Sequence, residues 1–272
     1  MLNLLKKSSI LALSIITIVF TFVPETIFET YKWLLNASDE VNIIVTRALA
    51  FIAVLFLSII INALYLFLRK SIRIKGKNYS IQIKYGDLFK MRSCKKVINF
   101  DECFTTSVGE LPAQVKLGSI CGQYLEKYPI QDQDMQALID KAQLKPARGK
   151  SKYQNKDKYE SGKLIPNGDY LLMAFVKLDE EGLGWLSRDE FLDCLSVLWK
   201  EIDKYYALKN VCIPVLGSGG FTRMGDVSLT QQELLDLIIW SYKLNSRKIK
   251  SPYKLKIICK KRDDFSLNKI DE

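Results

Sequence analysis

A glycine-rich segment late in the chain is the feature best suited to hold a phosphate. Gly217, Ser218, Gly219 and Gly220 follow an apolar run at residues 211–216 that is typical of a buried strand. Glycines let backbone N–H groups approach an anion closely, and a helix that begins soon afterwards adds favourable electrostatics. A structural turn explains such a loop equally well, and the chain lacks both GxxxxGK[ST] and GxGxxG. P-loop hydrolysis and a Rossmann-type cofactor site are therefore disfavoured.

The chain contains no histidine, which excludes many kinds of catalysis. Ser/His/Asp triads, Cys/His dyads and imidazole acid–base steps all require that side chain. Asp101 and Glu102 could form a carboxylate pair, but neighbouring residues on a strand point to opposite faces. The six cysteines include no CxxC pair and are expected to be buried, reduced thiols. We therefore expect no catalytic residue, no metal site and no resident cofactor.

Asp87 follows Gly86 at the end of a predicted strand, where its carboxylate lies at the edge of a sheet. By itself this is an ordinary Gly-Asp turn. Three motifs together resemble a macro domain: Gly-Asp-Leu at residues 86–88, Asn99 on a short strand, and Ile-Pro-x-x-Gly-x-Gly-Gly-Phe at residues 213–221. The resemblance covers residues 72–261. With the apolar segments before them, these residues look most like the transmembrane macro-domain effectors of Thoeris anti-phage defence.

The resemblance implies which residues hold a nucleotide. It assigns the adenine amino group to the carboxylate of Asp87, with Leu88 beside the ring. The glycine-rich loop would surround the diphosphate and the distal ribose, on which Phe221 would pack. The remaining ligand-binding residues implied by the resemblance are Asn99, Gly217, Ser218, Gly219, Gly220, Thr222 and Arg223. Phe221 as a core aromatic and Arg223 as a solvated surface residue stay open as alternatives.

One motif departs from the family pattern. Hydrolytic macro domains usually carry Val-Asn-Ala-Ala-Asn, whereas this chain has Val-Ile-Asn-Phe-Asp at residues 97–101. Only Asn99 of that motif is retained. Residues 105–109 are the candidate replacement for the first phosphate loop, although they contain a single glycine. The resemblance therefore implies ligand binding and puts hydrolysis of ADP-ribosyl groups in doubt.

Two apolar segments precede these motifs. Residues 8–28 are interrupted by Pro24, and residues 45–68 carry Arg47 as their one charged side chain. Their lengths suit transmembrane helices, so we expect a transmembrane hairpin at residues 1–70 and a cytoplasmic macro-like domain at residues 71–272. A cleaved signal peptide is the alternative for the first segment, but no A-x-A-like site follows it.

The charges that flank the apolar segments predict their orientation. The connection at residues 24–40 is mainly acidic, whereas residues 6–7 and 69–77 are basic. Positive charge stays inside, so we expect two spans of the cell inner membrane with both termini and the soluble domain cytoplasmic. Arg47 could snorkel to the outer boundary. Asn62 and Ser58 prefer helix contacts to lipid, and one hypothesis is that they face a neighbouring subunit and let the hairpins assemble.

Strand and helix patterns alternate through the soluble part. The expected elements are a hairpin at 72–83, strands at 96–100, 170–177, 211–216 and 254–259, and helices at 112–127, 134–144, 188–207 and 229–244. Such alternation predicts an α/β fold with both sheet faces covered. The resemblance implies a three-layer α/β/α macro-like domain with a mixed sheet. Residues 145–163 are expected to be a flexible basic loop.

These features predict a membrane-anchored receptor-effector. By resemblance, a TIR-domain enzyme makes an ADP-ribose-derived signal, histidine-linked ADP-ribose, and the macro domain binds it. The hairpins then form a homo-oligomer in contact with membrane lipid and disrupt the membrane. The residues themselves support an anion site joined to a bilayer anchor, since residues 71–272 hold 34 basic and 26 acidic side chains. A membrane-tethered ADP-ribosyl hydrolase is the alternative. A nucleic-acid binder is a third hypothesis, although we expect no nucleic-acid partner.

Overall fold

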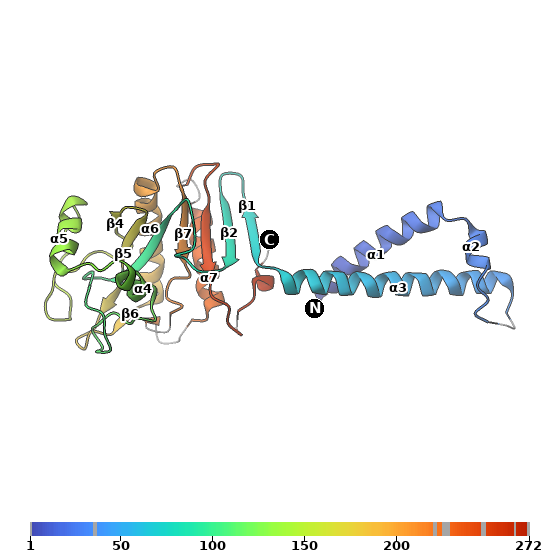
Figure 1. Ribbon diagram of the computed structural model, residues 1–272, viewed down its shortest axis with the longest axis horizontal. Coiled ribbons are helices and arrows are strands. Elements are labelled where there is room, and N and C mark those ends of the chain that lie inside the picture. The colour runs from blue at the N-terminus through green and yellow to red at the C-terminus, as the bar shows by residue number, and fades with distance from the viewer. Residues whose placement is uncertain are drawn as a thin grey trace. The chain divides into compact units, whose positions relative to one another are not determined.

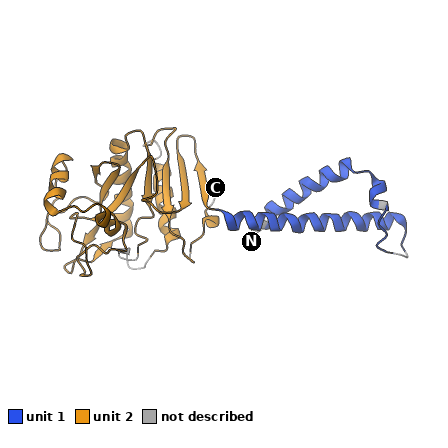
Figure 2. Ribbon diagram, in the orientation of Figure 1, with its two compact units in different colours: residues 1–69 blue, residues 70–272 orange. Residues whose placement is uncertain are grey.

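The chain folds into two compact units, Met1–Arg69 and Lys70–Glu272 (Figure 2). In the computed structural model the described residues are 2–34, 37–219, 222–224, 229–245, 249–263 and 265–270. Among them, the first unit is helical and the second contains all of the strands. The nucleotide-binding motifs and the apolar segments therefore belong to different units.

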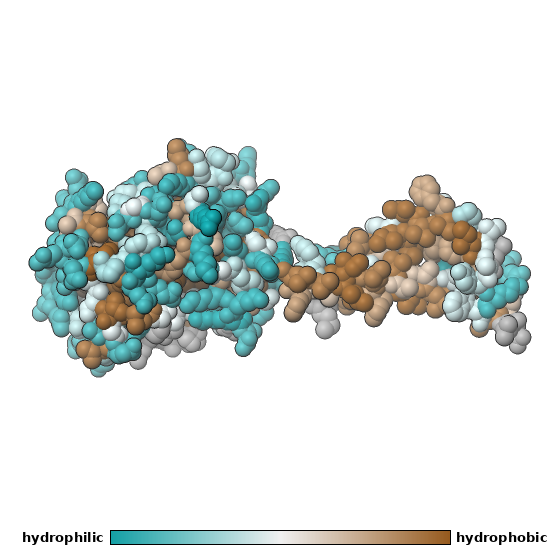
Figure 3. All heavy atoms as spheres, viewed as in Figure 1, coloured by the Kyte–Doolittle hydropathy of each residue, from teal (hydrophilic) through white to brown (hydrophobic). Residues whose placement is uncertain are grey.

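The first unit is a helical hairpin. α1 (Leu2–Phe22) is followed by the short α2 (Glu25–Glu29) and the long α3 (Asp39–Leu68) (Figure 1). α1 and α3 are long and apolar enough to cross a membrane, and their surfaces are largely hydrophobic (Figure 3). α1 ends at Phe22 and does not continue to residue 28. Pro24 explains this end, because proline lacks an N–H and disfavours a helical residue before it.

Polar side chains of the hairpin pair with one another. Nδ2 of Asn62 in α3 donates to Oγ of Ser8 in α1 at 3.1 Å, and Ser58 is also buried within its own chain. Within one chain, α1 therefore supplies a partner for Asn62, and the hypothesis that Asn62 and Ser58 face a neighbouring subunit stays a prediction. Nη2 of Arg47 lies 2.7 Å from Oε1 of Glu25, the first residue of α2, so these two side chains form an ion pair.

The described strands of the second unit form one nine-stranded mixed sheet in the order β1-β2-β9-β7-β3-β5-β6-β8, with β4 beside β5. The strands are β1 (Ser71–Lys75), β2 (Ser80–Tyr85), β3 (Cys94–Asp101), β4 (Leu164–Asn167), β5 (Tyr170–Leu178), β6 (Gly184–Leu186), β7 (Asn210–Pro214), β8 (Thr222–Met224) and β9 (Leu255–Cys259). β2, β9, β7, β3 and β5 run parallel to one another. Their carboxyl ends therefore meet at one edge of the sheet.

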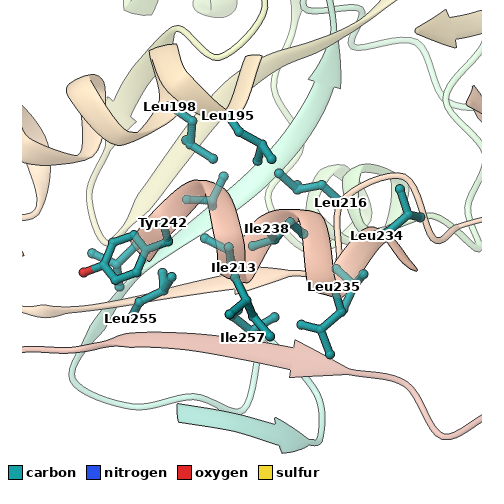
Figure 4. Packing of buried hydrophobic residues seen from close by; sticks show 14 of the residues in the cluster. Leu195, Leu198, Ile213, Leu216, Leu234, Leu235, Ile238, Tyr242, Leu255 and Ile257 are labelled. Carbon is teal, nitrogen blue, oxygen red and sulfur yellow. The ribbon is translucent and has the colours of Figure 1, made fainter. Parts of the chain in front are cut away.

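Helices cover both faces of this sheet. They are α4 (Ile120–Lys127), α5 (Asp132–Lys141), α6 (Arg188–Tyr205) and α7 (Gln231–Leu244). One buried cluster joins α6 and α7 to the sheet, where Leu198 and Ile238 approach Ile213 of β7 (Figure 4). A second cluster joins α4 and α5 to the opposite face around Phe100. The predicted three-layer α/β/α fold with a mixed sheet is confirmed.

Two local expectations were wrong. The helix predicted from residue 112 begins at Ile120, after a loop at residues 112–119. The segment at residues 145–163 is held in place, because Oγ of Ser151 donates to Oε1 of the buried Glu102 at 2.5 Å. Glu102 therefore has a structural partner and does not form a reactive pair with Asp101. All six cysteines are unpaired as expected, and five of them are buried, with Cys103 half-buried.

Candidate functional site

A cleft of about 420 Å³ lies at the carboxyl edge of the parallel strands. Its walls come from the ends of β3 and β5, the turn after β7, the residue after β9, the loop at residues 112–119 and the start of α4. Ligands of open α/β sheets bind outside the carboxyl ends of the strands. The topology therefore makes this cleft the candidate binding site.

The predicted glycine-rich loop forms one wall of the cleft. β7 ends at Pro214, and Gly217, Ser218 and Gly219 line the cavity. Gly217 has a φ of +80°, a conformation that residues with a Cβ rarely adopt. Oγ of Ser218 donates to the carbonyl oxygen of Val215 at 2.7 Å, and Nη2 of Arg262 donates to that of Ser218 at 2.6 Å. These bonds fix the loop at the edge of the sheet.

The amino end of α4 forms a second wall. Ser119 caps this helix, because its Oγ accepts a hydrogen bond from the N–H of Gly122 at 2.9 Å. The first N–H groups of a helix lack intrahelical acceptors, and the positive end of its dipole favours an anion. A Cβ at Gly122 would lie 2.2 Å from the carbonyl oxygen of Lys116. The glycine therefore allows the loop at residues 112–119 to pack closely against α4.

Two lysines and one aspartate carry charge at the cleft: Lys116, Lys260 and Asp101. Nζ of Lys116 donates to the carbonyl oxygen of Leu111 at 2.8 Å and to that of Glu110, so it braces the loop that it belongs to. Burial raises the pKa of the Asp101 carboxyl above its ordinary value, and hydrogen bonds from Thr105 and from the Cys103 N–H partly oppose this shift. The cleft thus combines two cations with a carboxyl that is easier to protonate than usual.

The structure brings four of the expected ligand-binding residues together. Asn99 and the three loop residues Gly217, Ser218 and Gly219 line the same cleft. Asp87 is exposed at the same sheet edge, where its Oδ1 accepts a hydrogen bond from the N–H of Phe89 at 2.8 Å. The described wall of the cleft does not include Asp87. Leu88 is 4% exposed and packs in the core beneath α4 and α5.

The other expected residues lie at or beyond the limits of what the structure describes. Gly220 and Phe221 are outside the described residues. Thr222 and Arg223 belong to β8, where they are paired with Gly184 and Trp185 of β6. β6 begins at the cleft, since Gly184 is one of the lining residues. The pairing therefore places the backbone of β8 beside a strand that reaches the site.

Several cleft residues were missed by reasoning from the sequence. Lys116, Ser119 and Lys260 line the cavity, whereas residues 105–109, the expected first phosphate loop, do not belong to its described wall. Gly118 and Ser119 ahead of an apolar run are a helix-start signal that could have located the amino end of α4. Lys260 follows the last strand directly, so parallel pairing of that strand would have placed it at the same edge.

Comparison with known protein families and relatives gives two matches. The family model described as "Thoeris protein ThsA, Macro domain" matches residues 81–260. The Thoeris protein ThsA of Bacillus amyloliquefaciens (strain Y2) is 31% identical over 223 residues, which cover 77% of this chain and 72% of that protein. The family match extends from β2 to the residue after β9, and so includes the elements that form the cleft.

Solved macrodomains are more distant. The Oceanobacillus iheyensis macrodomain with ADP is 10% identical, with a TM-score of 0.46 over 71% of this chain and 90% of that one. The macrodomain of Thermus aquaticus DarG is also 10% identical, with a TM-score of 0.39 over 67% of this chain and 98% of that one. A likeness this distant does not transfer a ligand or an activity to this chain.

Proposed function

This chain belongs to the ThsA macro-domain family of Thoeris proteins, and on that premise we propose that it is a membrane-anchored receptor-effector of anti-phage defence. Its macro domain binds an ADP-ribose-derived nucleotide signal. The observation that carries the proposal is the cleft, in which the turn at Gly217 and the amino end of α4 meet at the carboxyl edge of the sheet. Both features suit a diphosphate.

The proposed ligand fits the polarity and size of the cleft. A volume of about 420 Å³ lies in the range usual for small-molecule sites. The diphosphate lies between the glycine-rich loop and α4, with Lys116 and Lys260 near enough to offset its charge. The adenine extends along the sheet edge to Asp87, and the distal ribose lies toward Phe221. Asn99 contacts the ligand from the end of β3.

The proposed signal is histidine-linked ADP-ribose made by a TIR-domain enzyme. α1 and α3 anchor the chain in the cell inner membrane, with both termini in the cytoplasm. Signal binding then drives formation of a homo-oligomer that disrupts the membrane. This requires the signal to bind the assembled state better than the resting state, since equal affinity for both would shift nothing.

A short path joins the end of β2, next to Asp87, to the chain that follows α3. The N–H of Tyr85, two residues before Asp87, donates to the carbonyl oxygen of Lys70 at 3.2 Å. Lys70 follows Arg69, the C-cap residue of α3. A ligand that shifts the end of β2 therefore acts on a segment bonded to the chain just beyond α3. This contact supports coupling between nucleotide binding and the helices.

Dye release from proteoliposomes tests the proposal. Vesicles that contain the full chain should leak on addition of histidine-linked ADP-ribose and stay intact with ATP. Lys260→Glu, which reverses a charge in the cleft, should abolish leakage at the same signal concentration. The matched variant Lys141→Glu on α5 should leak normally. Leakage that is independent of the nucleotide, or unaffected by Lys260→Glu, would contradict the proposal.

One observation favours a membrane-tethered ADP-ribosyl hydrolase as the second candidate. Asn99 and Asp101 both line the cleft, and a carboxyl with a raised pKa suits a general base. Incubation of the full chain with ADP-ribosylated protein distinguishes the two functions. Release of free ADP-ribose that disappears in Asp101→Asn would establish the hydrolase. Binding without release supports the receptor.

A further inference from the structure

Two stretches of the chain carry basic side chains and no acidic ones. Residues 41–86 contain seven Lys or Arg, residues 237–262 contain nine, and neither stretch contains Asp or Glu. Elsewhere in the soluble part the two signs of charge are mixed, since residues 71–272 hold 26 acidic side chains in total. What distinguishes these two segments is that no acidic side chain of the same segment offsets their positive charge.

The fold brings these two segments together at one end of the sheet. β1 and β2 come from the first segment, and β9, the neighbour of β2, comes from the second. Gln82 is the register partner of both Arg73 and Lys256, so these two basic side chains share one face. The alternate residues Ile72 and Ile83 are buried in the core with α7. Hydrophilic surface covers this part of the domain in Figure 3.

A cleft of about 680 Å³ opens between the β1–β2 turn and residues 249–254. Five basic residues line it: Arg73, Lys75, Lys77, Lys250 and Lys254. No Asp or Glu is among its described lining residues, whereas Tyr79 and Tyr253 add aromatic rings. The pKa of Lys254 is lowered, first by burial and then by repulsion from Arg73, Lys256 and Lys75. The cations therefore lie close to one another, and the described lining of this cleft offers no carboxylate to offset them.

The covalent position of this surface indicates its partner. α3 ends at Leu68 and β1 begins at Ser71, so only two residues separate a candidate membrane span from the basic strand. Two residues extend over at most about 7 Å. When α3 crosses a bilayer, the start of β1 is therefore within reach of the headgroups. Anionic leaflets attract basic side chains near the membrane, and tyrosines favour the interface.

We propose that this basic face, defined as Arg73, Lys75, Lys77, Lys250, Lys254 and Lys256, docks on the anionic phospholipid headgroups of the leaflet that α3 enters. The inference rests on the membrane anchoring of the proposed function and is independent of the nucleotide cleft. Docking holds the end of the sheet that contains β1 and β2 at the bilayer surface. This contact then stabilises the unassembled state, and it must be released before the chains assemble.

Lysine acetylation in nanodiscs tests the docking. The full chain is placed in discs of phosphatidylcholine alone, or of phosphatidylcholine with phosphatidylglycerol, and acetylation rates are read by mass spectrometry. Lys75 and Lys254 should react about fivefold more slowly in the anionic discs. The exposed Lys127 and Lys141, on α4 and α5, should react at the same rate in both. High salt should remove the protection. Equal rates for Lys75 and Lys254 in the two discs would overturn the proposal.

Variants and soluble anions complete the test. Arg73→Glu with Lys75→Glu should restore the acetylation rate of Lys254 in anionic discs, whereas Lys127→Glu with Lys141→Glu should not. Inorganic phosphate or duplex DNA, added to the phosphatidylcholine discs, should give no protection. Protection by either to the extent seen with anionic lipid would assign the face to a soluble anion or to nucleic acid, and refute the docking. Nucleotide titration of the same discs separates this outcome from failure of the proposed receptor function.

Discussion

We expect Asp101 to make the nucleotide affinity of the cleft depend on pH. Its carboxyl has a raised pKa and lies in the cleft where phosphates are proposed to bind. Above that pKa the carboxylate repels the phosphates, and below it the neutral acid does not. Nucleotide affinity should therefore rise as the pH falls through the folded-state pKa of Asp101. Calorimetric titrations over a pH series measure this, and Asp101→Asn should give a flat profile. An unchanged profile in that variant would contradict the assignment.

The raised pKa of the Asp101 carboxyl also affects the stability of the folded chain. Because the folded-state pKa of Asp101 exceeds the unfolded value, ionisation favours the unfolded chain. The resulting penalty is absent below the unfolded pKa and grows as the pH rises to the folded pKa. We therefore compare the melting temperature of Asp101→Asn with that of the unchanged chain. The difference, variant minus unchanged chain, should be more positive at neutral pH than at acidic pH. The Asn side-chain oxygen can still accept the hydrogen bond from Cys103.

Asp87 is the residue on which the proposed recognition of adenine depends. Loss of a hydrogen bond to a charged group costs about 2 kcal/mol, so Asp87→Ala should weaken nucleotide binding by more than tenfold. Stability should change little, because Asp87 is exposed and its Oδ1 accepts a local hydrogen bond from the N–H of Phe89. Calorimetry with the matched variant Asp140→Ala on α5 provides the control. Normal binding by Asp87→Ala would refute the adenine assignment.

At the scale of elements, the long strands and helices are those that the sequence predicts. β5 is a continuous apolar run and α6 has an apolar face of helical period. α6 begins with a capping box, in which the N–H of Glu190 donates to Oγ of Ser187 at 3.2 Å. β4, β6 and β8 have four residues or fewer, too few for an alternating pattern. β4 and β6 form against the longer strand β5, and β8 in turn pairs with β6.

Residues 112–119 were predicted to be helical but form a loop before α4. Its apolar residues have helical spacing, but the N–H of Val115 donates to the carbonyl oxygen of Ser107 at 2.9 Å and its own carbonyl accepts from Gly109. These longer-range bonds replace the helical ones.

The site was predictable where its residues are consecutive, as in the turn at Gly217. Lys116 and Lys260 were not, because only the strand order brings them to the same cleft.

Close packing at the start of α4 gives a prediction at this scale. A methyl group at Gly122 would contact the backbone of Lys116 at 2.2 Å, so Gly122→Ala must displace the loop that lines the cleft. Overpacking of this kind costs about 1–3 kcal/mol. We expect a lower melting temperature and weaker nucleotide binding, measured by calorimetry. Gly168→Ala is the control. A methyl group at Gly168 would have no atom within 4 Å, although the φ of +58° is strained for alanine. Nucleotide binding should therefore be retained. Equal binding by both variants would argue against the loop as a ligand contact.

At the scale of the whole molecule, the candidate binding site and the candidate membrane spans lie in different units. The described residues of the cleft belong to Lys70–Glu272, whereas the two candidate spans lie in Met1–Arg69. The hydrogen bond from Tyr85 to Lys70 connects the strand next to the proposed adenine site with the first residue of the soluble unit. A signal receptor needs this kind of connection, because ligand binding must reach the helices through the chain that joins them to the domain.

Isothermal titration of the full chain in detergent tests the central claim, that the cleft is a receptor for an ADP-ribose-type signal. The titrants are histidine-linked ADP-ribose, ADP-ribose, NAD and ATP, and each mixture is assayed for products. We predict saturable binding that is tightest for histidine-linked ADP-ribose, with every ligand recovered unchanged. Binding of none of the four ligands would contradict the receptor, and conversion of the bound ligand to products would make the chain an enzyme.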